Sequence, residues 1–290
     1  MSGLLVLGAG GMLGRAVAEA ATAAGLPCSA PDRAELDLLD TAAVARRLDA
    51  ERPGAVVNCA AFTDVDGCEA RVEHALETNG HAVGRLARVV ASFGSNLLQV
   101  STDYVFPGDA RAPYGEDAET APRSVYGESK RLGERLALES GASIVVRTSW
   151  LFGPGGRNFV DTILRRAETG GSLRVVDDQV GCPTYAPYLA RALVDLAVAA
   201  IGERQPRPPS LLHYRNREPV SWYGFARAAL AEWELDVPIE PVTAAELSRP
   251  APRPAYSVLA VGRFEAWAER RVEDWRDALR DYRVRREAAA

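Results

Sequence analysis

The stretch LLVLGAGGMLG at residues 4–14 decides the fold of this chain. Its four leading apolar residues predict a short buried strand, and the glycines that follow predict a tight turn. Residues 12–24 then form an amphipathic pattern that predicts a helix ending at Gly25. A strand, a glycine turn and a helix in this order are typical of a dinucleotide-binding fold, in which the helix N-terminus offers backbone amides to a pyrophosphate.

The spacing of the glycines sets the register of this turn. Position 13 is Leu, so the strict GxGxxG spacing is missed, whereas Gly8, Gly11 and Gly14 fit the spacing GxxGxxG. Glycine is required where the chain turns tightly, where the backbone approaches a phosphate, and where the helix packs closely on the strand. We therefore expect these three glycines to contact a dinucleotide.

The rest of the chain predicts an α/β protein in two parts. Strands are expected at residues 27–30, 55–60, 97–101 and 143–147, and helices at residues 41–50, 72–93 and 125–140. This alternation indicates a Rossmann-type, doubly wound parallel sheet over residues 1–150. Beyond it, Gly- and Pro-rich loops separate shorter elements, and one helix is expected over residues 261–286. We expect residues 151–290 to form a smaller, mainly substrate-binding region that is partly interleaved with the dinucleotide-binding domain.

Composition excludes several classes of protein. The chain has 290 residues, a net charge of −5 and 47% hydrophobic residues, which is typical of a soluble globular protein. The acidic balance argues against nucleic acid or an anionic membrane as a partner. We expect a cytoplasmic location, because the sequence contains neither a long apolar run nor a secretory signal. The four cysteines and three histidines show no spacing typical of a metal site, so no bound metal is expected from the residues themselves.

A charged pair follows the predicted second strand. The Asp32 carboxylate could hold the ribose of an adenosine, as in NADH, and the Arg33 guanidinium could accept the 2′-phosphate of NADPH. The pair therefore leaves the choice between NADPH and NADH open.

The most specific signal is a tyrosine four residues before a lysine. Tyr126 and Lys130 lie on one face of the predicted helix, where an ammonium that favours the phenolate would make the phenol a usable acid or base. Lys130 is the single lysine of the chain, and every other residue of the Lys+Arg set is arginine. Because a guanidinium cannot replace a compact ammonium in such a role, this composition favours catalysis.

A third polar group is expected at the end of a strand. Thr102 follows the predicted strand at 97–101, and ligands of parallel sheets bind outside the carboxyl ends of the strands. We expect the Thr102 hydroxyl to bind a substrate carbonyl beside Tyr126.

With these residues in place, the chain resembles the extended short-chain dehydrogenases/reductases and, among them, the dTDP-4-dehydrorhamnose reductase family. The segments that carry the resemblance are GAGGMLG (8–14), DRAELDLLD (32–40), VVNCAAFTDVDGCE (56–69), STDYVFPG (101–108), YGESK (126–130), RTSWLFG and GRNFV (147–160), DDQVGCPT (177–184) and RPAYSVL (253–259). They span nearly the whole chain.

The resemblance implies a set of site residues. It places Gly11, Met12 and Leu13 at the coenzyme's pyrophosphate, beside Gly8 and Gly14 of the turn, and Asp32, Asp37 and Leu38 near its adenosine, beside Arg33. Along the rest of the coenzyme it places Ala61, Phe62, Thr63, Val100, Tyr126 and Lys130. On the substrate side it implies Thr102, Asp103, Trp150, Asn158, Gln179 and Arg253.

The resemblance also implies the reaction. NADPH or NADH would reduce the C4 keto group of a dTDP-linked 4-keto-6-deoxy sugar, with Tyr126 giving a proton, Thr102 polarising the carbonyl and Lys130 holding the nicotinamide ribose. Asn79 would support the proton path. The resemblance is also compatible with a bound Mg²⁺ ion and with a homodimer.

Three alternatives stay open at this point. The acceptor could be another dTDP-4-keto-deoxysugar of an antibiotic or cell-surface pathway. Cys182 could serve as the additional acid or base of an epimerase, whereas a dehydratase is disfavoured because Tyr104 follows Asp103 where sugar-nucleotide dehydratases carry a second acidic residue. The chain also resembles, more distantly, the non-catalytic regulatory subunit of methionine adenosyltransferase.

Overall fold

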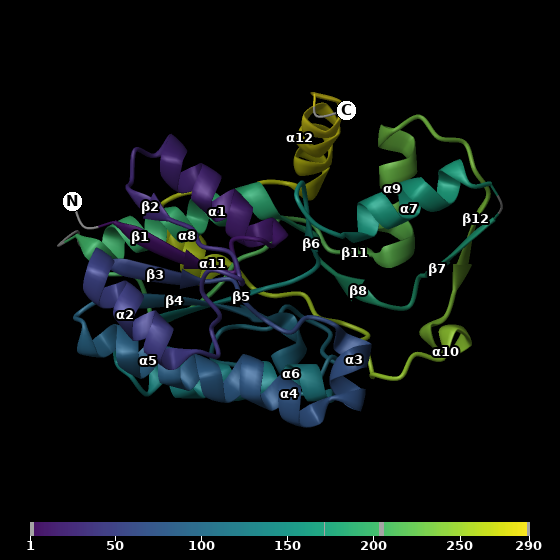
Figure 1. Ribbon diagram of the computed structural model, residues 1–290. Helices are drawn as coiled ribbons and strands as arrows, with labels where there is room; N and C mark the ends of the chain where they lie inside the picture. The colour runs from purple at the N-terminus through teal and green to yellow at the C-terminus, as the bar shows by residue number, and fades with distance from the viewer. Residues whose placement is uncertain (1–2, 171, 203–205, 289–290) are drawn as a thin grey trace.

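A six-stranded parallel sheet with helices on both faces forms the centre of the molecule (Figure 1). The computed structural model describes residues 3–170, 172–202 and 206–288. The sheet has the order β10-β5-β4-β3-β1-β2. Its strands are β1 (Leu4–Leu7), β2 (Cys28–Ser29), β3 (Ala55–Asn58), β4 (Asn96–Thr102), β5 (Ser143–Thr148) and β10 (Leu211–His213). This arrangement confirms the predicted α/β, doubly wound parallel sheet.

Two apolar layers enclose the sheet. On one face lie α1 (Met12–Ala23), α8 (Ala186–Ile201) and α11 (Gly262–Ala268), which pack on Val6, Val57 and Val146. On the other lie α2 (Thr41–Glu51), α5 (Ala82–Ser92) and α6 (Val125–Leu138), which pack on residues such as Leu7 and Val56. The predicted division at residue 150 stays a prediction. However, α8 and β10 come from beyond that residue and complete the sheet layer.

A second group of elements lies beyond the carboxyl edge of the sheet (Figure 1). They are α7 (Phe159–Glu168), α9 (Trp222–Glu232), α10 (Ala244–Leu247), α12 (Trp275–Ala288) and three short strand pairs. The pairs are β6 (Leu151–Phe152) with β9 (Thr184–Tyr185), β7 (Leu173–Val176) with β12 (Ile239–Val242), and β8 (Val180–Gly181) with β11 (Val220–Ser221). An aromatic cluster that includes Phe152, Phe225 and Trp275 holds this part together.

The single helix predicted over residues 261–286 is wrong. The structure has two helices, α11 and α12, separated by a turn that begins at Glu269, which has a left-handed φ of 51°. Phe264 of α11 packs into the core between the sheet and helices α1 and α8, whereas Trp275 and Tyr282 of α12 pack into the aromatic cluster. One straight helix could not reach both cores, so the chain turns between them.

The helix predicted over residues 72–93 is also interrupted. It consists of α4 (Val72–Leu76), a π-helical turn η1 (Glu77–His81) and α5, and it is preceded by a short helix α3 (Val65–Ala70) that the sequence analysis missed. The π-turn buries Asn79, whose side chain bonds the backbone of Phe62 and the hydroxyl of Ser129. Helical periodicity alone does not reveal such a one-residue insertion.

None of the helices within the described ranges combines the length and the apolar character that a membrane crossing needs.

A buried ion pair fastens α6 to the sheet. Arg147 of β5 donates to both carboxylate oxygens of Glu134 on α6, at 2.8 and 2.7 Å, and both side chains are 5% exposed. Because α6 also carries Tyr126 and Lys130, this pair fixes the helix that presents them.

We expect Glu134→Gln to lower the free energy of unfolding by about 3 kcal/mol, since it leaves a buried guanidinium without its carboxylate. The matched control is Glu139→Gln on the same chain segment, which breaks an exposed pair with Arg135 and should cost less than about 1 kcal/mol. Urea denaturation of the three proteins measures both values. Equal losses would contradict the assignment of Glu134 as the anchor of α6.

Candidate active site

A cleft of about 620 Å³ opens at the carboxyl edge of the central sheet. Its walls come from the turn after β1, the ends of β4 and β5, the start of α6, residues 155–157 and Trp222. Parallel sheets bind their ligands at this edge, because the loops after neighbouring strands converge there. The volume lies in the range of about 300–1,000 Å³ that is usual for small-molecule sites.

The glycine turn forms one end of the cleft and fits a dinucleotide. A Cβ atom at Gly14 would lie 2.3 Å from the Gly8 carbonyl oxygen, so only glycine lets α1 start this close to β1. Gly8 itself has a left-handed φ of 78°. Gly11 caps α1 without a side chain, so the first amides of the helix stay available for an anion. Met12 and Leu13 line the cleft beside them.

The residues expected near an adenosine lie just outside the glycine turn. The Asp32 Cβ atom is 3.9 Å from the position that a Cβ on Gly10 would take, and its carboxylate accepts the backbone N–H groups of Ala34 and Glu35. Arg33 pairs with Asp37 at 3.2 Å on the surface. The Leu38 side chain is part of the core below them.

The segment after β3 supplies another wall. Ala61 and Thr63 line the cleft, as does Val100 of β4. The ring of Phe62 instead packs against the Arg71 guanidinium, 4.3 Å from its centroid. The Asn79 amide accepts a hydrogen bond from Phe62 N at 2.8 Å and donates one to Phe62 O at 3.0 Å, which holds this wall in place.

Tyr126 and Lys130 lie in the cleft, one turn apart on α6. The Lys130 ammonium donates to the Val100 carbonyl at 2.7 Å, and burial lowers its pKa to about 8. Burial raises the pKa of the Tyr126 phenol, and the nearby Thr102 hydroxyl opposes that rise. The expected lowering of this pKa by Lys130 stays a prediction. A phenol with a raised pKa stays protonated at neutral pH and can give a proton.

Thr102 and Asp103 lie beside the tyrosine at the end of β4. The Thr102 hydroxyl donates to the Asp103 carboxylate at 3.0 Å and accepts from Tyr104 N at 3.3 Å. Asp103 is 1% exposed, and burial raises its pKa to about 6. A carbonyl oxygen bound in the cleft would compete with Asp103 for the Thr102 proton.

Two stacked tryptophans form the far wall of the cleft. The rings of Trp150 and Trp222 lie 3.5 Å apart and are nearly parallel. Trp150 has a left-handed φ of 47°, and a Cβ atom at Gly181 would lie 2.5 Å from its ring. The Trp150 ring is therefore held between Gly181 and Trp222.

Three of the expected substrate contacts are not among the described residues that line the cleft. Asn158 is buried and caps α7 by accepting from Asp161 N. Arg253 donates to Asp66 at 3.0 Å and to the Ala251 carbonyl, which ties the C-terminal segment to α3. Gln179 is buried just before β8.

Several residues of the cleft were not predicted from the sequence, and three of them are aromatic or charged: Tyr104, Arg157 and Trp222. Tyr104 lies edge-on against Tyr126 with ring centroids 5.5 Å apart, and Trp222 stacks on Trp150. Arg157 lines the cleft at the end nearest the glycine turn. Tyr104 and Arg157 stand inside segments that were singled out, but Trp222 stands in a segment without any motif.

Cys182 does not belong to the described cleft lining, and burial raises the pKa of its thiol to about 12. This position does not suit the sugar-facing acid or base of an epimerase. Within the described ranges, no group of three or more His, Cys, Asp or Glu side chains is arranged to hold a metal ion.

Comparison with known proteins agrees with this geometry. A family model described as the RmlD substrate binding domain matches residues 1–286. A dTDP-4-dehydrorhamnose reductase of Streptomyces griseus is 41% identical over 95% of this chain and 91% of the relative. A probable dTDP-4,6-dihydroxy-2-methyloxan-3-one 4-ketoreductase of Streptomyces antibioticus is also 41% identical, over 96% of this chain and 93% of the relative.

A solved structure shares the fold over nearly its whole length. It is the dTDP-4-dehydrorhamnose reductase of Bacillus anthracis in complex with NADP, with a TM-score of 0.92, 29% identity, and coverage of 98% of this chain and 100% of that one. Together with the family match, these relatives show that the chain belongs to the RmlD substrate binding domain family, the family of the dTDP-4-dehydrorhamnose reductases.

Proposed function

We propose that this chain uses NADPH or NADH to reduce the C4 keto group of dTDP-4-dehydro-6-deoxy-L-mannose (dTDP-4-dehydrorhamnose), giving dTDP-L-rhamnose. The observation that carries the proposal is the gathering of Thr102, Tyr126 and Lys130 in one cleft with the glycine turn. The names of relatives at about 40% identity support the substrate, a dTDP-linked keto sugar. The homodimer and the cytoplasmic location stay predictions.

The coenzyme would be held along the glycine-turn side of the cleft. Gly8, Gly11 and Gly14 with Met12 and Leu13 would bind its diphosphate, and Asp32 stands beside the turn where an adenosine ribose would lie. When bound, the reduced nicotinamide supplies the hydride for the C4 carbon. The Lys130 ammonium, which is charged below pH 8 or so, would bind the neighbouring ribose.

Tyr126 would give the proton that the new hydroxyl requires. Its raised pKa means that the phenol is protonated at neutral pH. Thr102 would donate to the substrate's C4 oxygen in place of Asp103, which polarises the carbonyl. Asp103 and Trp150, which also line the cleft, would contact the sugar.

The alternative substrate is another dTDP-4-keto-deoxysugar. It is tested directly, because the probable 4-ketoreductase of Streptomyces antibioticus and the dTDP-4-dehydrorhamnose reductase of Streptomyces griseus are both 41% identical to this chain. The test mixes the purified protein with NADPH or NADH and either dTDP-4-dehydrorhamnose or another dTDP-4-keto-deoxysugar. We expect rapid loss of nicotinamide absorbance with dTDP-4-dehydrorhamnose and dTDP-rhamnose as the product. Oxidation with the other sugar alone would move the function to that ketoreductase, and binding of NADPH without any oxidation would favour a non-catalytic role.

We expect Tyr126→Phe to lower kcat by roughly 100- to 10,000-fold, since it removes the proton donor and little volume. Coenzyme affinity should stay within about twofold, which NADPH fluorescence titration measures. Tyr223→Phe, at a half-buried tyrosine of α9 that does not line the cleft, serves as the control. Near-normal turnover by Tyr126→Phe would rule out the assigned proton donor.

The pH profile tests Lys130. Because the lowered pKa of Lys130 leaves it charged below about 8 and neutral above, kcat/KM should fall as the pH rises through about 8. Lys130→Arg should lower kcat/KM at every pH, because the wider guanidinium fits poorly, and should move the alkaline fall upward, because arginine does not titrate there. An alkaline fall at the same pH in both proteins would show that another group controls it.

A further inference from the structure

We propose that residues 153–157 form a clasp over the glycine turn, that Arg157 of this clasp pairs with the coenzyme's diphosphate, and that Tyr282 of α12 holds the clasp in place through Asn158. The inference rests on the proposed function, since it concerns the same coenzyme site. It gives a role to the C-terminal helix, which lies outside the cleft.

The clasp lies directly on the first turn of α1. A Cβ atom at Gly156 would come within 2.8 Å of the Met12 Cβ atom and 3.4 Å of its backbone nitrogen. Gly155 has a left-handed φ of 85°, and a Cβ there would meet the Arg15 side chain at 3.2 Å. Glycine at these positions lets the backbone of the clasp approach the anion-binding end of the helix.

The charges of the cleft are unevenly distributed. Of the described residues that line it, two are basic, Lys130 and Arg157. Lys130 stands beside Tyr126 at the reacting end, whereas Arg157 directly follows Gly156, which lies against the first turn of α1. A diphosphate brings negative charge to this end, and a guanidinium can pair with two of its oxygens at once.

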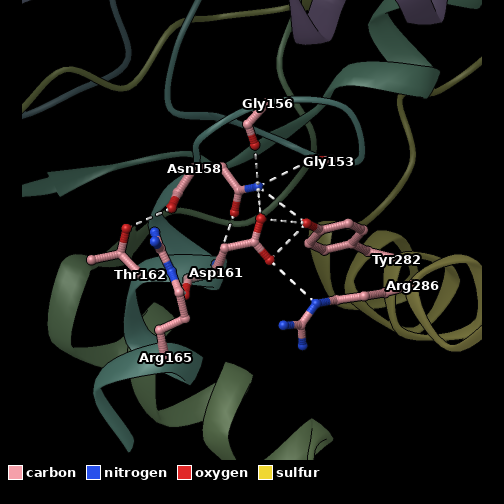
Figure 2. A network of polar contacts seen from close by, with 8 residues as sticks. All are labelled: Gly153, Gly156, Asn158, Asp161, Thr162, Arg165, Tyr282 and Arg286. Carbon is pink, nitrogen blue, oxygen red and sulfur yellow. Dashed lines mark hydrogen bonds and ion pairs between the residues drawn. The ribbon is translucent and has the colours of Figure 1, made fainter. Parts of the chain in front are cut away.

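Asn158 holds the clasp from below, as Figure 2 shows. Its side-chain nitrogen lies 3.0 Å from the Gly153 carbonyl and 3.2 Å from the Gly156 carbonyl, at the two sides of the clasp. The same nitrogen lies 2.8 Å from the Asp161 carboxylate and 3.1 Å from the Tyr282 hydroxyl. An amide has two N–H groups, so these four acceptors compete for two protons.

Tyr282 affects this competition because it binds one of the four acceptors, the Asp161 carboxylate. Its hydroxyl donates to the Asp161 carboxylate at 2.9 Å, and the Arg286 guanidinium approaches the same carboxylate at 3.5 Å (Figure 2). Burial raises the pKa of Tyr282 to about 12, so the phenol stays a donor at neutral pH. Tyr282 and the Asn158 amide thus share the Asp161 carboxylate, and loss of the Tyr282 hydroxyl would draw the amide toward Asp161 and away from the two clasp carbonyls. Tyr282 is a positioning residue that acts through Asn158.

The first test is Arg157→Gln, with equilibrium binding of NADPH, ADP, 2′-AMP and dTDP as readouts. We expect the Kd of NADPH and of ADP to rise about tenfold, as for loss of a charge-assisted pair. The Kd of 2′-AMP, which lacks a diphosphate, and of dTDP should not change. Arg157→Lys should restore part of the affinity, and Arg166→Gln, at an exposed arginine of α7, is the matched control.

The second test separates positioning from simple stability. We expect Tyr282→Phe to raise the Kd of NADPH about threefold, and the double variant with Arg157→Gln to bind no more weakly than Arg157→Gln alone, because both changes act on one contact. A merely structural role for Tyr282 would lower the Tm and leave the Kd of NADPH unchanged. That result, or additive losses in the double variant, would overturn the link through Asn158.

The remaining outcomes are distinct. Weaker binding of dTDP with unchanged binding of NADPH would assign Arg157 to the substrate's diphosphate and overturn the clasp as stated. Unchanged binding of all four ligands by Arg157→Gln would overturn it and leave the proposed function intact. Failure of the unaltered protein to bind either NADPH or NADH would overturn the proposed function itself.

Discussion

The contact between Gly14 and the Gly8 carbonyl is the constraint on which the rest of the site depends. Because neither a side chain on Gly14 nor a right-handed backbone at Gly8 can be accommodated, the chain leaves β1 and enters α1 within a few residues. This tight turn points the first amides of α1 at the carboxyl edge of the sheet, where the loops after β3, β4 and β5 also converge. An anion site and a reaction site thereby share one cleft.

Burial then sets the protonation of the reacting groups. Burial lowers the pKa of Lys130 to about 8 and raises the pKa of Tyr126, so at neutral pH the lysine is mostly charged and the phenol is protonated. A protonated phenol is the form that the reduction requires, since Tyr126 gives its proton to the new hydroxyl. The buried pair of Arg147 and Glu134 keeps the helix that carries both residues against the sheet.

Much of this organisation can be predicted from the sequence, where local chemistry is decisive. Gly8, Gly11 and Gly14 predict the turn, and a lone lysine four residues after Tyr126 predicts the reacting pair. Features set by distant packing could not be predicted. The chain turns at Glu269 because Phe264 and Trp275 pack into different cores. Asn158 lies in a segment that resembles a substrate site, yet it caps α7 and contacts Tyr282, more than a hundred residues away.

The central claim is that this cleft brings a reduced nicotinamide to the C4 carbon of a dTDP-linked keto sugar. The most direct measurement uses NADPH with deuterium at its transferable position, and NMR of the dTDP-sugar product formed from dTDP-4-dehydrorhamnose. The account predicts one deuterium at C4 of the sugar, and a product that matches dTDP-L-rhamnose. Deuterium at another carbon, or a product without deuterium, would contradict it.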